Sequence, residues 1–584
     1  MVERDDVIEN FSDMGIDLPE DVVDKCMELC RLYKIDGSDL FEIWTSFSAT
    51  NHEDNVPTIE LLSMMEKKGF FKSTTSSKDK SSEQKSIVIL DDDMDLLNVE
   101  DTIPSSPTLN LSNTAEQVKL KDSRPSVPPP GPVASFSDGN PTKEYTSRKN
   151  SGHVVCNYGN HVDTLSWSTS EKYAPEVEFS EEFNPVNPKV RYMFSTILDK
   201  IQTYKKQGDD LCKDIIDNND LKPPIETHHI TMETATFAGR ILCDGRGKLN
   251  PSSLLLECCL FNIREEKVKL EVNEAPEYSL FPGQVIVVEG KNPDGKRIIA
   301  EKIYADAKPD IYPDFDPSKN LQESLQVVIA CGPFMLANGS YQPFLDLKKY
   351  VVKNLPHVLI IIGPLVDAQN PNILQFGNNM KFIDCFESLL KTLMDDLEGT
   401  HTKVVYTSSW RESNLHIVYP TPHPLHVSFK SKNLSNLKLV PDPSILDISG
   451  FTIGVTASDI LLHLSPEELC HPNTPQNVPR LCRIASHLLK QKSFYPLKPS
   501  HDEMSIDARL STEHAYIPLK PHVLVLPSNL KSFVNVADDC VIINPERVAK
   551  GEYGGSFARL QVRKATDGEK WSPATHISAQ VIKV

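Results

Sequence analysis

A long stretch that is poor in apolar side chains divides this sequence. Residues 72–176 are rich in Ser, Thr, Lys, Asp and Pro, and they include a proline-rich run at residues 126–132. Such a composition buries too little apolar surface to offset the conformational entropy that folding removes. We therefore predict a disordered Ser/Pro-rich linker at 72–176 with a folded part on each side of it.

The length and charge of the chain limit its architecture and its partners. A chain of 584 residues exceeds what one hydrophobic core supports, so several domains are expected. The 61 basic and 81 acidic residues give a net charge of −20, which opposes a surface that follows a phosphate backbone along its whole length. We expect any contact with DNA to be weak or indirect.

The sequence carries no sign of a membrane span or of a standard secretion signal. The amino terminus is acidic, and the most hydrophobic run, residues 358–366, is far shorter than the roughly 20 residues that cross a bilayer. The 12 cysteines are scattered, so we expect reduced thiols. Cys26 and Cys30 stand one helical turn apart and could share a metal, but no second Cys/His pair follows nearby, which favours a place in a helical core.

Residues 1–71 predict a small helical domain that binds partners. Apolar residues recur there at helical spacing in three segments, and turn or capping residues such as Gly37, Ser38 and Thr58 separate the segments. The predicted apolar faces are Val23, Cys26, Cys30 and Tyr33, then Leu40, Ile43, Trp44 and Phe47, then Leu61, Leu62 and Met65.

Two short features of the linker could have roles of their own. The aliphatic run Ile87, Val88, Ile89 and Leu90 precedes three aspartates and is similar to a SUMO-interacting motif, in which a short strand adds to the sheet edge of a partner. A chance cluster of the same composition is the alternative, because short motifs recur without function. Ser106 precedes a proline and fits the minimal site of a proline-directed kinase.

The next segments predict a helical lead-in at 177–224, with a helix at about 188–206, and an OB-fold barrel at 225–308. Short strand candidates at 235–242, 253–258 and 284–289 alternate with turn sequences, as in a small barrel. OB barrels that bind single strands need exposed aromatic rings in a cationic groove. The aromatic candidates are Phe237, Phe261, Tyr278 and Phe281. Because a small barrel must fill its interior, we expect most of them inside it, and we favour a barrel that docks protein.

Residues 309–584 predict a layered α/β domain. The buried-strand candidates 327–330, 358–362, 404–406 and 523–526 alternate with helical segments such as 378–397 and 480–491. The order of strands and loops resembles the calcineurin-type metallophosphoesterase fold. An active member of that family places Asp and His ligands after successive strands, where they hold two metal ions that activate a water.

Every ligand cluster that this resemblance implies is altered. A thiol and a proline follow the first strand, a proline replaces the bridging carboxylate after the second, an arginine follows the third, and no histidine follows the last. The degenerate positions are Cys331, Pro333, Pro364, Asp367, Arg411, Ser528 and Asn529. His416, His423 and His426 do not restore the spacing. We expect no metal, no cofactor and no phosphoesterase activity, the alternative being an active enzyme with displaced ligands.

Three stretches carry a wider resemblance. Residues 330–334, 362–367 and 544–560, together with the arrangement of barrel and altered phosphoesterase domain, resemble the B subunits of replicative DNA polymerases, and the alpha-polymerase branch in particular. The resemblance implies a fold class that is multidomain α+β: an N-terminal helical domain, a disordered linker, an OB-fold β-barrel, and an α/β calcineurin-like phosphoesterase-type sandwich lacking metal ligands.

The same resemblance implies a non-catalytic nuclear protein with a defined set of partners. These are the catalytic subunit of DNA polymerase alpha, contacted through its C-terminal zinc module, the primase subunits of the same complex, and replication initiation factors, which the N-terminal domain binds. The corresponding protein of another replicative polymerase would share the architecture. The helical domain and long linker favour the alpha branch.

Overall fold

The computed structural model describes residues 18–33, 57–67, 141–159, 173–245, 247–260, 267–307, 323–373, 381–472, 478–565 and 569–584, with isolated positions between these ranges. None of the helices in these ranges is both long and apolar enough to span a lipid bilayer. The aliphatic run at 87–90, Ser106 and Phe261 lie outside the described residues.

The N-terminal segment contains helices with a common apolar core. Helix α2 (Glu20–Tyr33) and helix α4 (Ile59–Lys67) contribute to it, and the helical positions Leu40, Trp44 and Phe47 are buried in the same cluster. Cys26 and Cys30 belong to this core, and burial raises the pKa of the Cys26 thiol to about 12. These thiols therefore pack as small apolar side chains.

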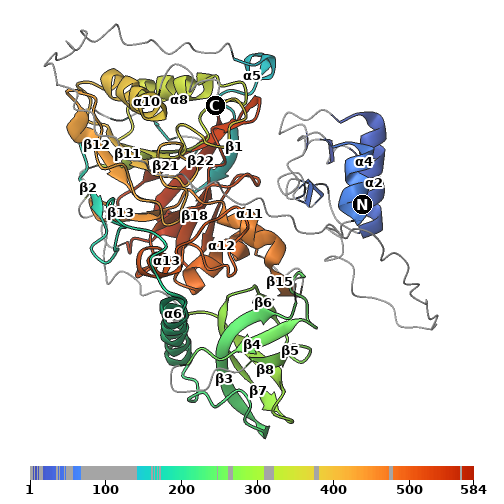
Figure 1. Cartoon of the computed structure of the whole chain (residues 1–584). Coiled ribbons are helices and arrows are strands. Elements are labelled where there is room, and N and C mark those ends of the chain that lie inside the picture. Colours follow the sequence, from blue (N-terminus) through green and yellow to red (C-terminus); the bar gives the residue numbers. More distant parts are fainter. Residues whose placement is uncertain are drawn as a thin grey trace, which may run out of the picture. The chain divides into compact units, whose positions relative to one another are not determined.

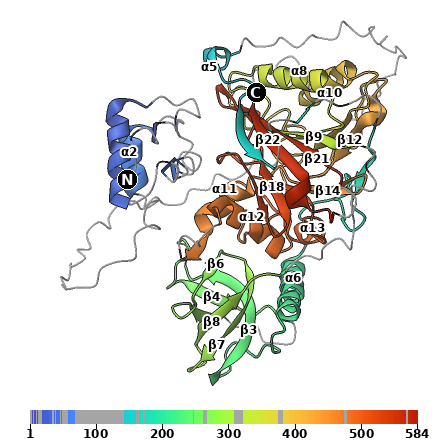
Figure 2. The same cartoon turned by 180° about the vertical axis from the view of Figure 1, so that it is seen from behind.

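The α/β domain contains two sheets (Figures 1 and 2). The seven-stranded sheet has the order β1 (Val154–Tyr158), β22 (Ile577–Lys583), β21 (Ser556–Val562), β9 (Leu325–Cys331), β10 (Val358–Ile362), β11 (Lys403–Thr407) and β12 (Leu437–Val440). The six-stranded sheet has the order β17 (Phe533–Ala537), β18 (Cys540–Asn544), β16 (Val523–Val525), β14 (Phe451–Val455), β13 (Ser444–Ile448) and β2 (Val177–Phe179). Strands β9 to β12 run parallel, as do β14, β16 and β18.

The core of this domain lies between the two sheets. Aliphatic side chains of β9, β10, β14, β16 and β22 form one buried cluster there. Helices α8 (Gln342–Asn354) and α10 (Phe382–Asp396) cover the outer face of the larger sheet, with Tyr350 against Phe557 and Phe386 against Tyr406. Helices α11 (Ile460–Leu464), α12 (Arg480–Lys490) and α13 (Ala508–His514) lie beside the smaller sheet (Figure 1). The four strands and two helices predicted in this region are confirmed, within a few residues at their ends.

The predicted extent of the linker is wrong at its C-terminal end. Residues 141–159 contain helix α5 (Lys143–Ser147) and strand β1, which pairs antiparallel with β22. The Tyr145 ring is buried, and its hydroxyl donates to Asp346 at 2.8 Å. The polar composition of the surrounding segment hid these elements, because β1 is only five residues long and its pairing with β22 is a long-range contact.

The barrel predicted at 225–308 is present as a closed five-stranded sheet. Its order is β3 (Thr231–Cys243), β4 (Leu254–Glu257), β5 (Lys267–Glu271), β8 (Arg297–Tyr304) and β7 (Val285–Asn292). Phe237 lies in its core, as expected. Phe281 is also buried but belongs to the core around α12, with its ring 5.0 Å from that of His487, so its expected place inside the barrel is corrected.

The lead-in helix, α6 (Ile197–Asn218), begins nine residues later than predicted and extends twelve residues further. Thr196 caps it, because the Thr196 hydroxyl accepts from the Asp199 N–H while the Asp199 carboxylate accepts from the Thr196 N–H. This reciprocal capping box determines where the helix starts. The apolar residues before it, including Val190, therefore lie outside the helix.

A two-stranded sheet and a hydrogen bond to a buried ion pair join the barrel to the α/β domain. Strand β6 (Tyr278–Leu280), which precedes β7, pairs antiparallel with β15 (Leu469–His471) of the α/β domain. Beside it, Glu468 accepts from Arg483 at 2.8 and 2.9 Å and from the Ser279 hydroxyl at 2.6 Å. These contacts bind the barrel tightly to the α/β domain.

Candidate functional site

The positions that the sequence assigned to altered metal ligands meet at one edge of the α/β domain. Cys331 ends β9, Pro364 follows β10, Arg411 follows β11, and Ser528 follows β16. The carboxyl ends of parallel strands in such a domain point to the same edge, which is where ligands of α/β folds bind. We take this cluster of loops, the strand-end site, as the first candidate site.

A guanidinium group lies in the middle of the strand-end site. Arg547 is buried, and its Nη1 donates to Sγ of Cys331 at 3.0 Å and to the Gly332 carbonyl at 3.2 Å. Its Nη2 donates to Asp459 Oδ2 and to the Pro527 carbonyl, both at 3.4 Å. One cation therefore bridges the loops that follow strands of both sheets.

Pro333 and Pro364 lie in the loops after β9 and β10, which are in close contact. Both prolines follow cis peptide bonds, to Gly332 and Gly363. A Cβ at Gly332 would lie 2.1 Å from the Pro364 carbonyl oxygen, so no larger residue fits there without a backbone shift. The Gly332 N–H donates to the Ile362 carbonyl at 2.8 Å, and this hydrogen bond holds the two loops close together.

The Asp367 carboxylate pairs with Arg411. Arg411 Nε donates to Oδ1 at 3.1 Å and Nη2 donates to Oδ2 at 2.5 Å, a bidentate geometry that matches the planar guanidinium to the carboxylate. Asp367 is buried, so the pair is shielded from solvent on one side. Both oxygens of the one carboxylate that remains in the predicted ligand set therefore accept hydrogen bonds from Arg411.

Glu412, next to Arg411, is a buried carboxyl group that the sequence did not reveal. It accepts from the Leu365 and Val366 N–H groups at 2.7 Å each and from the Tyr406 hydroxyl at 2.5 Å. Burial raises its pKa to about 7, although these three donors oppose the rise. The signal that could have found it is an acidic residue in the short loop after a buried strand, five residues beyond the end of β11.

Ser528 and Asn529 take part through their backbones. The Ser528 N–H donates to Asn544 Oδ1 at 2.9 Å, and the Asn529 N–H donates to Asp459 Oδ2 at 2.8 Å. Asp459 also caps helix α11 by accepting from the Leu462 N–H. This aspartate and Arg547, neither of which the sequence singled out as site residues, organise the loop after β16.

The strand-end site is therefore a set of ion pairs and hydrogen bonds within the protein. Arg411 faces Asp367, Arg547 faces Asp459, and burial raises the pKa of the Cys331 thiol, which favours its uncharged form. Two of the three histidines weighed as alternative ligands have protein partners. The His416 ring is tilted against Tyr192 with ring centroids 5.6 Å apart, and His423 Nδ1 lies 2.7 Å from the Pro424 carbonyl. His426 is exposed.

A second candidate site is an exposed apolar strip at the start of α6. Phe194 and Ile197 are each 76% exposed and Leu198 is 69% exposed, with Ile201 continuing the same helical face. We name Phe194, Ile197, Leu198 and Ile201 the lead-in strip. Ile197, Leu198 and Ile201 lie on the first turns of α6, with Ile197 and Ile201 one turn apart, and Phe194 lies in the segment just before the helix. An apolar helix face of this kind can enter a groove of a partner. Large side chains of this kind are rarely left in water without a function.

Three family models match successive parts of the chain. The N-terminal model of the DNA polymerase alpha B subunit covers residues 5–72, the OB-domain model of the same B subunit covers residues 200–306, and a model shared by the B subunits of DNA polymerases alpha and epsilon covers residues 327–535.

Curated relatives resemble the chain over its whole length. The DNA polymerase alpha B subunit of the mouse is 28% identical over 610 residues, covering 100% of both chains, and that of the fruit fly is 28% identical over 633 residues with the same coverage. The fission yeast protein of the same name is 30% identical over 391 residues, covering 63% of this chain and 65% of its own. The order of the three matched parts and these full-length relatives show that the chain belongs to the family of DNA polymerase alpha B subunits.

Proposed function

We propose that the chain is a non-catalytic scaffold of a nuclear DNA polymerase alpha–primase complex. In this role its barrel and α/β domain bind the C-terminal zinc module of the catalytic subunit, and its N-terminal domain contacts replication initiation factors during primer synthesis. The names of the relatives support an accessory role in this polymerase. The observation that carries the non-catalytic part is the buried guanidinium of Arg547 among the strand ends.

That guanidinium opposes phosphoesterase chemistry for an electrostatic reason. Two divalent cations held about 3.5 to 4 Å apart need several anionic ligands around them. Here Asp459 and Asp367 are each paired with an arginine, and the loops also supply two prolines, which have no side-chain lone pair. A metal ion at this place would have to displace a buried, permanently charged guanidinium.

The test of this part is an assay with added metal. Purified full-length protein, supplied with Mn²⁺, should hydrolyse neither phosphomonoesters nor phosphodiesters above the rate of a mock preparation. Asp367→Ala serves as the control for contamination, because it removes the last carboxylate of the predicted ligand set. Hydrolysis that persists through purification and disappears in this variant would contradict the proposal and favour an enzyme with displaced ligands.

The lead-in strip is the surface on which we propose that the catalytic subunit docks. Three contacts hold the strip rigidly. The Met193 N–H donates to Asp507 at 2.7 Å, and the Tyr192 hydroxyl donates to the Pro420 carbonyl at 2.7 Å. Thr196 caps the helix itself. A rigid apolar surface loses little entropy on binding. Permanent subunit interfaces are large and apolar, and the strip borders a barrel and a domain that already form one unit.

A binding experiment tests the strip directly. The double variant Ile197→Asp with Leu198→Asp should weaken capture of the C-terminal module of the catalytic subunit roughly 100-fold or more, because two charges would be buried in an apolar contact. The matched control is Ile230→Asp with Met232→Asp, which changes two exposed apolar residues at the start of β3, outside α6. Equal loss in both variants, or no loss in the first, would contradict the location.

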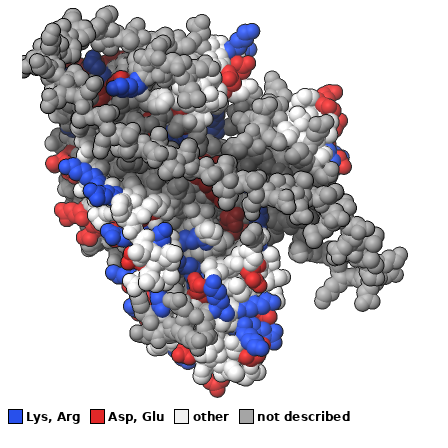
Figure 3. Space-filling view, in the orientation of Figure 1, with Lys and Arg blue, Asp and Glu red and all other residues white. Residues whose placement is uncertain are grey.

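The barrel could instead bind nucleic acid, but its aromatic and basic residues favour this second function less. Phe237 and Phe281 have no exposed surface on which a base could stack. Barrel cations pair with acids, as in Lys291 with Glu301 at 2.5 Å and Arg297 with Glu271 at 3.3 Å. Figure 3 shows basic and acidic side chains interspersed over this part of the molecule.

A further inference from the structure

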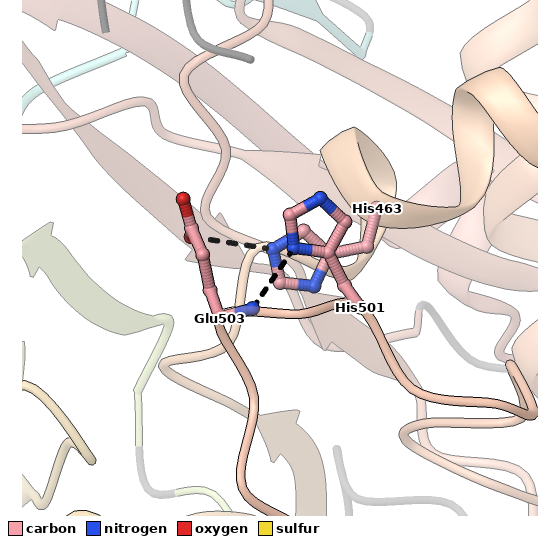
Figure 4. A group of neighbouring side chains, drawn as sticks. All are labelled: His463, His501 and Glu503. Atoms are coloured by element: carbon pink, nitrogen blue, oxygen red, sulfur yellow. Dashed lines mark hydrogen bonds and ion pairs between the residues drawn. The ribbon is translucent and has the colours of Figure 1, made fainter. Parts of the chain in front are cut away.

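Within the described part of the chain, three metal-ligating side chains converge at one place (Figure 4). His463 comes from helix α11, while His501 and Glu503 come from the loop before α13. One ligand atom of each lies within 4.8 Å of the others. The two imidazole rings are parallel, with centroids 4.3 Å apart, and His463 Nε2 lies 3.9 Å from Glu503 Oε2.

A hydrogen bond at Nδ1 fixes the ring orientation of His463. Its Nδ1 lies 2.9 Å from the Tyr495 hydroxyl, and the oxygen of that hydroxyl also accepts from the His501 N–H at 3.2 Å. His463 and Tyr495 are both buried. A histidine whose Nδ1 is held by a hydrogen bond while its Nε2 faces other ligating groups has the arrangement of histidines that bind metals.

The donor types of the cluster suit a divalent cation. Its three residues offer two imidazole nitrogens and one carboxylate oxygen. Metals bind these groups in their deprotonated forms, so metal binding here would release protons.

We propose that His463, His501 and Glu503 bind one divalent transition-metal ion, with zinc as the best match. Two imidazole nitrogens and one carboxylate oxygen are a known zinc donor set, which a water completes. Ligand atoms around a tetrahedral zinc lie about 3.3 Å apart, so these three must approach by roughly 1 Å. The ring planes must also tilt, which the partly exposed loop residues His501 and Glu503 permit.

The bound ion would have a structural effect next to the lead-in strip. It would tie the 501–507 loop to helix α11, and Asp507 in that loop accepts the hydrogen bond from Met193 directly before the strip. None of its three ligands is among the positions of the strand-end site, but the two sites are neighbours, because Asp459 caps the helix that carries His463. Its occupancy is independent of whether the chain binds a polymerase.

Cobalt(II) titration of the metal-depleted full-length protein tests the site. We expect one equivalent of Co²⁺ with the visible absorption of nitrogen and oxygen ligands, displaced by Zn²⁺, and a Tm that rises with Zn²⁺. His501→Ala and Glu503→Gln should each weaken binding roughly tenfold or more, whereas His153→Ala, at an exposed histidine outside the cluster, should leave it unchanged. His463→Ala should abolish it, but this buried position requires a check of folding.

Two results would overturn the proposal. The first is a stoichiometric Co²⁺ spectrum with thiolate charge-transfer bands that disappears in Cys26→Ser, which would assign binding to the Cys26 and Cys30 pair. The second is an unchanged affinity in both His501→Ala and Glu503→Gln while each variant retains the Tm of the metal-free protein. Since both residues are partly exposed, we expect these two variants to fold.

Discussion

The side-chain amide of Gln491 exchanges two hydrogen bonds with the backbone of Val285. The Val285 N–H donates to Oε1 at 2.8 Å, and Nε2 donates to the Val285 carbonyl at 3.0 Å and to the Ala305 carbonyl at 2.9 Å. Gln491 follows α12 in the α/β domain, whereas Val285 begins β7 of the barrel. One side chain therefore acts as a strand partner across the junction and fixes the barrel relative to the domain.

Gln491→Leu should destabilise the junction. Leucine is similar in size, but it leaves one N–H and two carbonyls buried without partners, which costs about 2 to 4 kcal/mol in total. We expect a lower urea midpoint for the transition that includes the barrel. Gln561→Leu is the matched control, because the buried Oε1 of Gln561 accepts no hydrogen bond in the described chain, and its cost should be small. Equal effects of the two substitutions would contradict the role of Gln491.

Asp442 should make stability fall as the pH rises. It is fully buried, Oδ1 accepts from Thr456 Oγ1 at 2.8 Å and from the Ala457 N–H at 2.9 Å, and Oδ2 has no partner among the described residues. Burial raises its pKa from 3.8 to about 7. The folded state therefore binds the proton more tightly than the unfolded state, so the stabilisation is complete below about pH 3.8 and is lost as the pH rises through about 7.

Asp442→Asn measures this effect, because asparagine keeps the Oδ1 acceptor and cannot ionise. The free energy of unfolding of the variant, minus that of the unaltered protein, should increase by about 1 kcal/mol between about pH 6 and pH 8 and remain constant at higher pH. Urea unfolding at these pH values checks it. A difference that is independent of pH would show that Asp442 is already ionised at the lower pH.

Arg547→Met should destabilise the α/β domain without creating a metal site. The substitution leaves the Asp459 carboxylate buried without its counter-ion, which costs about 3 to 5 kcal/mol. Differential scanning calorimetry of the full chain should show a lower Tm for this domain. Arg509→Ala is the control, since Arg509 forms an exposed pair with Glu513 within one helix and should change stability by about 0.5 kcal/mol or less. A variant as stable as the control would mean that Arg547 does not hold the loops together.

The sequence predicted the buried strands well, because the apolar runs at Val358 to Ile362 and Val523 to Leu526 have few alternatives to a sheet interior. The resemblance to the phosphoesterase fold placed the altered ligand positions in the loops after these strands, and the structure brings those loops together at one edge. The start of α6 was missed because apolar periodicity alone placed it at Pro188, whereas the capping box at Thr196 determines it.

Groups that meet only after folding could not be found from local patterns. Arg547 contacts Cys331 across more than two hundred residues of sequence, and His463 meets His501 from another element. Strand β1 was assigned to the linker because its pairing with β22 is a long-range contact that no local composition reports. Long-range pairing is therefore the common cause of the missed residues and of the misplaced linker boundary.

The corrected linker boundary leads to a truncation experiment. A fragment of residues 141–584 retains α5 and β1, whereas a fragment of residues 160–584 lacks both and exposes the edge of β22. The shorter fragment also loses the buried Tyr145 ring and the Arg148 guanidinium, which donates to Asp346 at 2.7 Å and to the Val584 carbonyl at 3.0 Å.

Burial of one aromatic ring alone stabilises by roughly 2 kcal/mol, and the lost strand pairing adds to this. We expect fragment 141–584 to show the same Tm for the α/β domain as the full chain, and fragment 160–584 to show a Tm lower by roughly 5 °C or more. Tyr145→Ala in the longer fragment should account for part of the difference, while Lys143→Ala, at an exposed position of the same helix, should not. Equal Tm values for the two fragments would mean that α5 and β1 contribute nothing to the fold and that the linker extends to residue 176 after all.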